Sequence, residues 1–121
     1  MKIAVVGAGG VGAYLGAVCA QAGHPVALLA RGAHAAALAH AGITIHGPRG
    51  SWTARPAMVT DNPETIGVAD VVFITVKNYH LPTVVPRLGA MMGPRTVVLT
   101  LQNGVHAYGQ VAAAVGAAVV D

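Results

Sequence analysis

Short apolar runs alternate along this chain with segments in which apolar residues recur at helical spacing. The first run, residues 3–6, is mostly β-branched, a pattern typical of a strand covered on both faces of a parallel sheet. A second run, VVFITV at residues 71–76, predicts another central strand. Strands alternating with helices predict an α/β fold, a doubly wound parallel sheet with helices on both faces. Further strands are expected at residues 26–30, 96–101 and 117–120.

The segments between these runs carry helix start and stop signals. Asn62 followed by Pro63 predicts a capped, single helical turn at residues 63–66. Between residues 79 and 92 the spacing is helical, but Pro86 predicts a kink or two short helices there. The remaining helices are expected over residues 10–21, 33–41 and 105–115.

One stretch breaks this alternation. Residues 43–46 and 52–59 have strand character and flank the turn sequence GPRG at residues 47–50. Glycine and proline at such a position favour a tight reversal of the chain. The pattern therefore predicts a small hairpin inserted at one edge of the sheet.

A glycine-rich turn directly follows the first strand. Gly7, Gly9 and Gly12 stand in the G-x-G-x-x-G spacing of Rossmann-type dinucleotide-binding folds. The first glycine allows a tight turn, the second lets the backbone approach a pyrophosphate, and the third lets helix and strand pack closely. Phosphate would then lie on the free N–H groups at the positive end of the helix.

The same spacing can also mark a plain tight turn in any α/β domain, because this chain is rich in glycine and alanine. The context favours a dinucleotide site, since a strand precedes the turn and an amphipathic helix is predicted after it. The apolar residues of that helix, near helical spacing, are Val11, Leu15, Val18, Cys19 and Ala22.

Arg31 follows the second predicted strand, where an NAD-binding fold usually carries an acidic residue on the ribose 2′-hydroxyl. A carboxylate there would repel a 2′-phosphate, whereas a guanidinium can hold one through paired hydrogen bonds. Arg31 therefore indicates selectivity for NADP over NAD. The alternative is a solvated arginine at the end of a strand.

Two further polar residues follow predicted strands at the same edge of the sheet. Lys77 follows residues 71–76, so we expect it beside the glycine turn, in contact with the cofactor or extended into water. Asn103 follows the next strand and can both donate and accept hydrogen bonds, which suits a nicotinamide ribose or a substrate carbonyl. It could equally cap the helix that follows, and the two roles are compatible.

Composition limits the class of protein. At 121 residues the chain is expected to be one domain, and a chain with 55% apolar and 9% charged residues is expected to cover apolar surface against another domain or subunit. Its formal net charge of +3 suits an anionic ligand, but the arginines are scattered and the aromatics few, so nucleic-acid binding is not expected. No apolar run reaches the length of a membrane span, and a cytoplasmic location is expected.

The cysteine and histidine content offers little further chemistry. Cys19, the single cysteine, excludes an internal disulfide and is expected to fill the core beside the first helix. No metal site is predicted from the histidine spacing, and most of the six histidines are expected at the surface. His80 and His106, near the two functional loops, are the exceptions considered.

Four segments, in this order and spacing, resemble the N-terminal half of the ketopantoate reductase (2-dehydropantoate 2-reductase) family, and together they cover nearly the whole chain. They are MKIAVVGAGGVGAYLGA at residues 1–17, the Arg31-Gly32 pair, VFITVKNYH at residues 72–80 and LTLQNGV at residues 99–105. The resemblance implies NADPH-dependent reduction of 2-dehydropantoate to pantoate, with hydride delivered from C4 of the nicotinamide, in pantothenate biosynthesis.

By position, the resemblance also implies roles for individual residues. Arg31 would hold the 2′-phosphate, Lys77 and Asn103 the ribose and nicotinamide side, and Asn103 would also neighbour the 2-keto acid substrate. Where family members commonly have glutamine, three residues after the lysine, this chain has His80 in the cofactor site. The pyrophosphate would lie on the turn formed by Gly7, Ala8, Gly9, Gly10, Val11 and Gly12.

The family's general-acid lysine belongs to a helical C-terminal domain that these 121 residues do not include, so the chain alone is expected to bind NADPH with little or no turnover. That domain, or a second copy of the chain, is the expected partner. One alternative is a non-catalytic dinucleotide sensor, although such modules usually carry an acidic residue in place of Arg31. Another is a reductase of a different keto acid.

Overall fold

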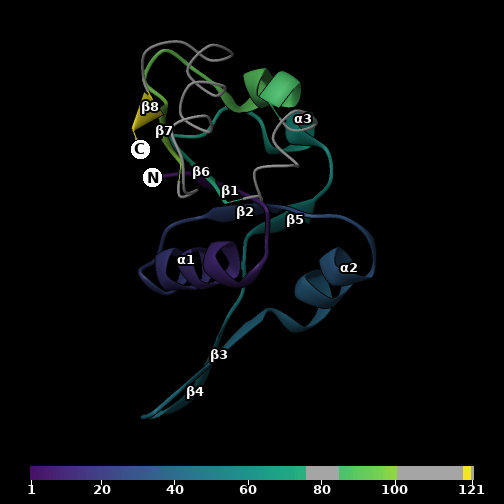
Figure 1. Ribbon diagram of the computed structural model, residues 1–121, viewed down its shortest axis with the longest axis vertical. Coiled ribbons are helices and arrows are strands. Elements are labelled where there is room, and N and C mark those ends of the chain that lie inside the picture. Colours follow the sequence, from purple (N-terminus) through teal and green to yellow (C-terminus); the bar gives the residue numbers. More distant parts are fainter. Residues whose placement is uncertain (76–84, 101–118, 121) are drawn as a thin grey trace.

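The computed structural model describes residues 1–75, 85–100 and 119–120. Its centre is a six-stranded sheet in which every pair of neighbouring strands is parallel (Figure 1). The chain starts in the middle of the sheet, extends it to one side, and then returns to extend it to the other, which confirms the doubly wound prediction. In spatial order the strands are β5 (Met58–Thr60), β2 (Val26–Leu29), β1 (Ile3–Val6), β6 (Val71–Ile74), β7 (Val97–Thr100) and β8 (Val119–Val120).

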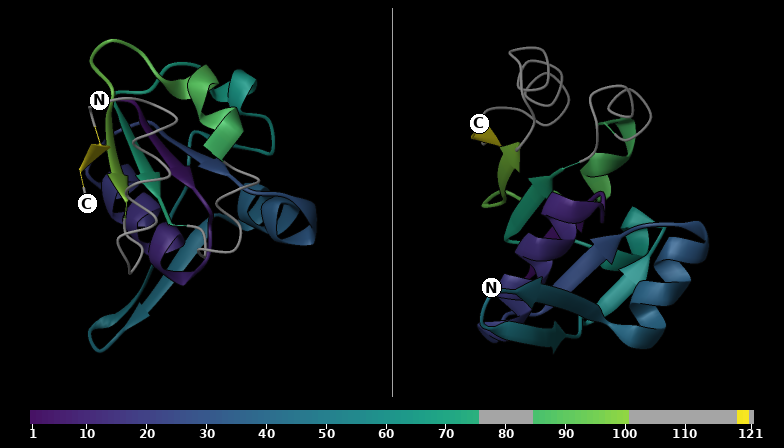
Figure 2. Two further views of the ribbon diagram at one scale, coloured as in Figure 1. Left: turned by 45° about the horizontal axis from the view of Figure 1, so that its top comes forward. Right: turned by 60° about the horizontal axis from the view of Figure 1, so that its bottom comes forward.

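Helices cover both faces of this sheet. α1 (Gly10–Gln21) and α2 (Gly32–Ala41) lie on one face, and α3 (Pro63–Ile66) and the 3₁₀ helix η2 (Val85–Met91) lie on the other (Figures 1 and 2). The predicted cap of α3 is present, because Asn62 Oδ1 accepts a hydrogen bond of 3.0 Å from the Glu64 backbone N–H. The helix expected over residues 105–115 lies outside the described residues.

Pro86 stands in the first turn of η2, where its missing N–H costs no helical hydrogen bond. η2 is therefore consistent with one of the short helices predicted around this proline. Residues 76–84 lie outside the described part.

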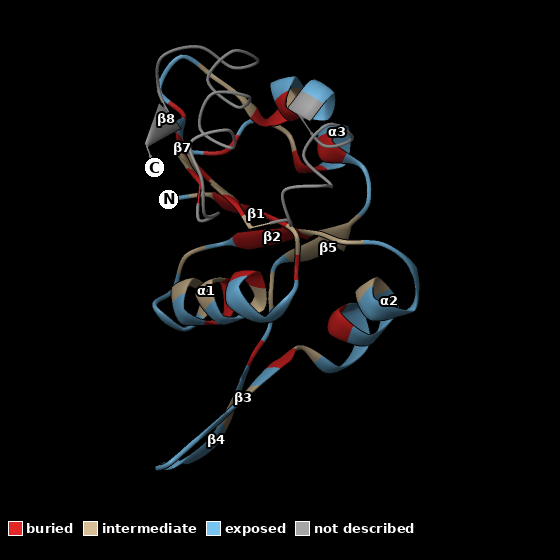
Figure 3. Cartoon of the chain, in the orientation of Figure 1, coloured by how far each residue is buried: buried red, intermediate tan, exposed pale blue. Residues whose placement is uncertain are grey.

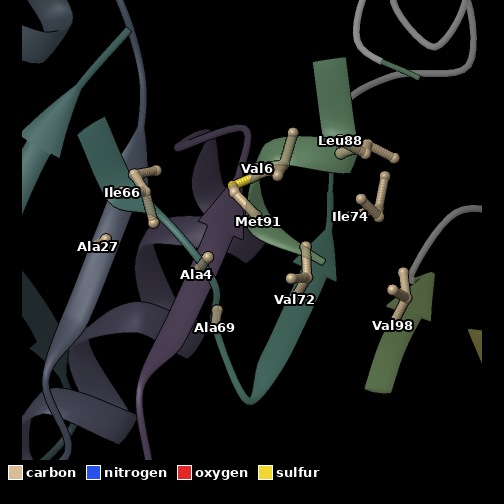
Figure 4. Packing of buried hydrophobic residues seen from close by; sticks show 10 residues of the cluster. All are labelled: Ala4, Val6, Ala27, Ile66, Ala69, Val72, Ile74, Leu88, Met91 and Val98. Carbon is tan, nitrogen blue, oxygen red and sulfur yellow. The ribbon is translucent and has the colours of Figure 1, made fainter. Parts of the chain in front are cut away.

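The central strands of the sheet are buried (Figure 3). Their alternate residues pack into two separate cores. Ile3 and Val5 of β1 pack with the helices α1 and α2, whereas Ala4 and Val6 pack toward α3 and η2. All four are buried, as expected for a central parallel strand. Figure 4 shows the second core, in which the sheet residues meet Ile66, Leu88 and Met91.

The apolar stripe predicted on α1 is only partly correct, because Leu15 and Cys19 are half-buried but the valines of the stripe are exposed. Val11 and Val18 are 60% and 41% exposed, and the residues that α1 buries are Gly12, Gly16 and Ala17. The cause is close approach: a Cβ on Gly16 would already lie 3.0 Å from Leu28 Cδ2 of β2. Small residues rather than large apolar ones therefore form the contact with the sheet. Cys19 is half-buried against this core, as expected.

The predicted hairpin exists, but it is not part of the main sheet. β3 (Ile43–Gly47) and β4 (Gly50–Ala54) form a separate antiparallel pair that projects away from the body of the molecule (Figures 1 and 3). The prediction of a single strand over residues 52–59 is also wrong, because the strand is interrupted at Arg55 and Pro56. Proline has no N–H for a ladder, and after it β5 starts afresh beside β2.

Candidate functional site

The predicted site residues that the structure describes lie at one edge of the sheet. The last residue of β1, Val6, is in register with Leu29 of β2 and with Ile74 of β6. Because parallel strands end at the same edge, the segments that follow these three residues are neighbours. They are the glycine turn, the loop carrying Arg31, and Thr75.

At two positions in the turn the local structure requires glycine. Gly7 has φ +95°, a conformation that favours glycine, and its N–H donates to the Leu29 carbonyl at 3.3 Å. Gly12 has no room for a side chain, since a Cβ there would collide with the Gly7 carbonyl oxygen and Thr75 Oγ1. These two positions let helix α1 begin directly against the end of β1.

At Gly9 and Gly10 the local structure does not require glycine. A Cβ at either position would meet no atom of the described residues within 4 Å. Gly9 has φ −72°, which any residue adopts, and Gly10 is not among the glycines with positive φ. The fold does not need glycine at either place, so their effect is to leave the backbone at the start of α1 bare.

The bare backbone is the N-terminal end of a helix. Gly9 is the N-cap of α1 and makes no side-chain cap hydrogen bond. The first N–H groups of a helix lack partners within the helix, and the helix dipole makes this end positive. The turn also carries no charged side chain between residues 7 and 12. An anionic group could therefore approach the amides closely.

Thr75, at the end of β6, holds this turn from one side. Its hydroxyl donates to the carbonyl oxygens of both Val6, at 3.0 Å, and Gly7, and its backbone N–H also donates to Val6 at 2.9 Å. We did not predict this role from the sequence. A threonine at the end of a strand that neighbours the glycine turn is the signal that could have suggested it.

Arg31 lies at the matching end of β2. It is the N-cap of α2, with an extended backbone (φ −142°, ψ 165°), and its side chain is exposed. Gly32 follows with φ +71°, a left-handed conformation that turns the chain into the helix. The guanidinium is therefore carried on a short turn between two ordered elements, beside the glycine turn.

His34 joins these two parts of the site, and it too was missed. Its ring Nε2 lies 2.6 Å from the carbonyl oxygen of Ala8 in the glycine turn. A carbonyl oxygen only accepts, so the ring nitrogen carries the proton in this contact. The sequence predicts most histidines at the surface, and His34 is exposed. Its position three residues after Arg31 was the available signal.

The other predicted site residues lie outside the described residues: Lys77, His80 and Asn103. Among the residues that are described, no group of three or more histidine, cysteine, aspartate or glutamate side chains could hold a metal ion. In the same part of the chain, no helix is both long and apolar enough to cross a membrane. Burial raises the pKa of the Cys19 thiol, which favours its protonated, unreactive form.

Comparisons with known proteins agree with this geometry. Residues 3–120 match the family model described as ketopantoate reductase PanE/ApbA. The chain is 36% identical over 114 residues to an uncharacterised oxidoreductase (YkpB) of Bacillus subtilis, covering 94% of this chain and 37% of that protein. It is 34% identical over 106 residues to 2-dehydropantoate 2-reductase of Mesorhizobium japonicum, covering 87% and 32% of the two chains.

A solved structure gives the same result in three dimensions. The crystal structure of 2-dehydropantoate 2-reductase from Porphyromonas gingivalis superposes with a TM-score of 0.87 at 35% identity, over 98% of this chain and 44% of that one. The chain thus spans less than half the length of each of these relatives. On its sequence, its Rossmann-type fold and its glycine turn, the chain belongs to the ketopantoate reductase family of oxidoreductases.

Proposed function

We propose that these 121 residues form the NADP(H)-binding part of a reductase that converts a 2-keto acid, 2-dehydropantoate, to the 2-hydroxy acid for pantothenate biosynthesis. The observation that carries the proposal is the pairing of two features at one sheet edge. These are the bare backbone of Gly9 and Gly10, and an exposed arginine at the end of the neighbouring strand.

The residues present fit a dinucleotide. A pyrophosphate needs close contact with backbone N–H groups, and Gly9 and Gly10 present a helix start that no side chain of the described residues covers. Gly12 keeps that helix start against β1, because nothing larger fits between it and the Gly7 carbonyl. In our proposal the pyrophosphate lies along residues 7–12, with Ala8 and Val11 contributing backbone only.

Arg31 decides which dinucleotide is bound. A guanidinium holds a 2′-phosphate through charge-assisted, paired hydrogen bonds, which NAD(H) cannot accept at that position. The side chain of Arg31 is exposed, so it is free to reach such a group at the end of β2. We therefore propose selectivity for NADP(H).

The proposed reaction uses residues beyond the glycine turn and Arg31. When bound, the reduced nicotinamide supplies the electron pair and hydrogen that reduce the keto carbonyl. We propose that Lys77 and His80 contact the cofactor, and that Asn103 orients the nicotinamide ribose and the substrate carbonyl. The proton donor for the developing alkoxide is proposed to come from outside these 121 residues, so the chain alone binds cofactor without appreciable turnover.

Calorimetric titration of the chain with NADPH and with NADH, at one fixed salt concentration, tests the proposal. We expect tighter binding of NADPH than of NADH. Arg31→Ala should weaken NADPH binding by about 1.5 to 3 kcal/mol, the scale of a hydrogen bond to a charged group, and leave NADH nearly unchanged. Arg49→Ala, an exposed arginine in the hairpin turn, is the matched control and should change neither.

Other outcomes would contradict specific parts of the proposal. Equal affinity for the two cofactors would favour a general dinucleotide sensor. Equal weakening of both by Arg31→Ala would mean that this arginine is structural. Reduction of ketopantoate by the 121-residue chain at the rate of a complete reductase would refute the proposal that the proton donor comes from outside these residues.

A further inference from the structure

The glycine turn and the Arg31 loop belong to different elements, and one side chain joins them directly. His34 lies in the first turn of α2, and its Nε2 donates to Ala8 across 26 residues of sequence, at 2.6 Å. Short contacts of this kind fix the relative position of the two groups that they connect.

The start of α2 is held from two sides. Before Arg31, the Leu29 carbonyl oxygen accepts from the Gly7 N–H at 3.3 Å and the Ala30 N–H donates to Thr60; after Arg31, the side-chain contact to the glycine turn is the one made by His34. Arg31, the N-cap, makes no side-chain cap hydrogen bond, and Gly32 with φ +71° is a residue of high backbone freedom. The residue that α2 buries, Leu38, lies toward the other end of the helix. Backbone bonds of β2 therefore fix the chain before Arg31, and His34 fixes the start of α2 after it, so Arg31 is positioned relative to the glycine turn from both sides.

The affinity for a ligand with two anionic groups depends on the distance between the glycine turn and Arg31. If its pyrophosphate lies on the glycine turn and its 2′-phosphate on Arg31, the second contact is intramolecular once the first has formed. Its strength then depends on how well the two subsites are held at the matching separation. A ligand with only one of the two groups does not depend on the separation.

We propose that His34 is a positioning residue that sets the distance between the pyrophosphate-binding turn and the 2′-phosphate-binding arginine. The inference depends on the proposed function, because it concerns the same site. It predicts that His34 strengthens the binding of NADP(H) without strengthening the binding of either half of that ligand alone.

Three probes separate this role from a general structural one: 2′-phospho-ADP-ribose carries both groups, ADP-ribose lacks the 2′-phosphate, and 2′-AMP lacks the pyrophosphate. In calorimetry and NMR titrations, His34→Ala should weaken 2′-phospho-ADP-ribose and NADPH roughly tenfold, the effect of one lost hydrogen bond. Binding of ADP-ribose and of 2′-AMP should be unchanged.

Two further variants serve as controls. His34→Gln keeps a side-chain N–H donor and should recover most of the lost affinity, whereas His34→Leu, of similar size without a donor, should not. His40→Ala changes a histidine in the last turn of the same helix and should leave all four affinities unchanged. Circular dichroism establishes whether each variant is folded. If His34→Ala does not fold, the comparison of His34→Gln with His34→Leu still tests the proposal.

The proposal is overturned if His34→Ala leaves NADPH binding intact, or if it weakens the two fragments as much as the whole ligand, since that pattern indicates a structural role. If the wild-type chain binds none of the probes, the proposed function itself fails and this inference with it. If the wild type binds them all and only the fragment comparison fails, the proposed function stands.

Discussion

The two kinds of glycine in the turn can be separated by a single type of substitution. Gly12→Ala and Gly10→Ala add the same methyl group to the first turn of α1, two residues apart. At Gly12 the methyl would collide with the Gly7 carbonyl oxygen and Thr75 Oγ1, while at Gly10 no atom of the described residues lies within 4 Å. Opposite effects on stability are therefore expected.

The magnitude follows from two opposing terms. Replacing a helical glycine by alanine stabilises by about 0.5 to 1 kcal/mol, because the unfolded chain loses backbone freedom. Overpacking costs about 1 to 3 kcal/mol, and the upper end applies to Gly12 because the colliding atom is backbone and cannot rotate away. Gly12→Ala should thus destabilise by about 2 kcal/mol. Gly10→Ala should stabilise by about 0.5 kcal/mol, the lower end of the range, because Gly10 is the first residue of α1.

Urea unfolding of the 121-residue chain, followed by circular dichroism, measures both. With a slope of about 1 to 3 kcal/mol per molar urea, the Gly12→Ala midpoint should fall by roughly 1 M, and the Gly10→Ala midpoint should stay within a few tenths of a molar of the wild type. Equal midpoints for Gly12→Ala and the wild type would show that α1 can move away from β1. The close packing assigned to Gly12 would then be wrong.

Three further predictions follow from the same structure. Gly9→Ala should destabilise by less than about 1 kcal/mol, because alanine caps a helix less well than glycine, but it should weaken NADPH binding at least tenfold, because the methyl group covers backbone that the pyrophosphate needs. Calorimetry should show no such loss of binding for Gly89→Ala, an exposed glycine whose added Cβ also meets no described atom. Thr75→Val should destabilise by about 1 kcal/mol in urea unfolding, through the lost bonds to Val6 and Gly7, and Thr75→Ser should restore most of it, so equal stability of the two variants would rule out the hydroxyl. Burial raises the pKa of Cys19 in the folded state, so the folded chain holds this proton more tightly, and the free energy of unfolding should fall as pH rises through the ordinary thiol range. Cys19→Ser should remove that part of the pH dependence, and an unchanged pH profile of the unfolding free energy would contradict the prediction.

The features that depend on local pattern follow from the amino-acid sequence alone. Three such features are the mostly β-branched four-residue runs β1 and β6, the Asn62 cap and the glycine spacing after β1. Each depends only on residues close to it in the sequence. The order of strands and helices then allowed few sheets other than a doubly wound one. The family resemblance rested on the same local segments and was confirmed by the match over residues 3–120.

Tertiary structure decided what depends on the distance between elements. Whether α1 buries its large or its small residues depends on how closely it approaches β2, and the spacing of apolar residues alone did not show that the small residues make the closest contact. The hairpin separated from the sheet because Pro56 interrupts the chain before β5 takes the edge position beside β2.

The two side chains that hold the glycine turn depended on tertiary structure in the same way. Thr75 reaches Gly7 across 68 residues and His34 reaches Ala8 across 26. Neither contact has a sequence pattern of its own, because each exists only once β6 and β2 lie on either side of β1. Local propensities specify the elements, but a hydrogen bond between distant residues forms only where the packed fold brings donor and acceptor together.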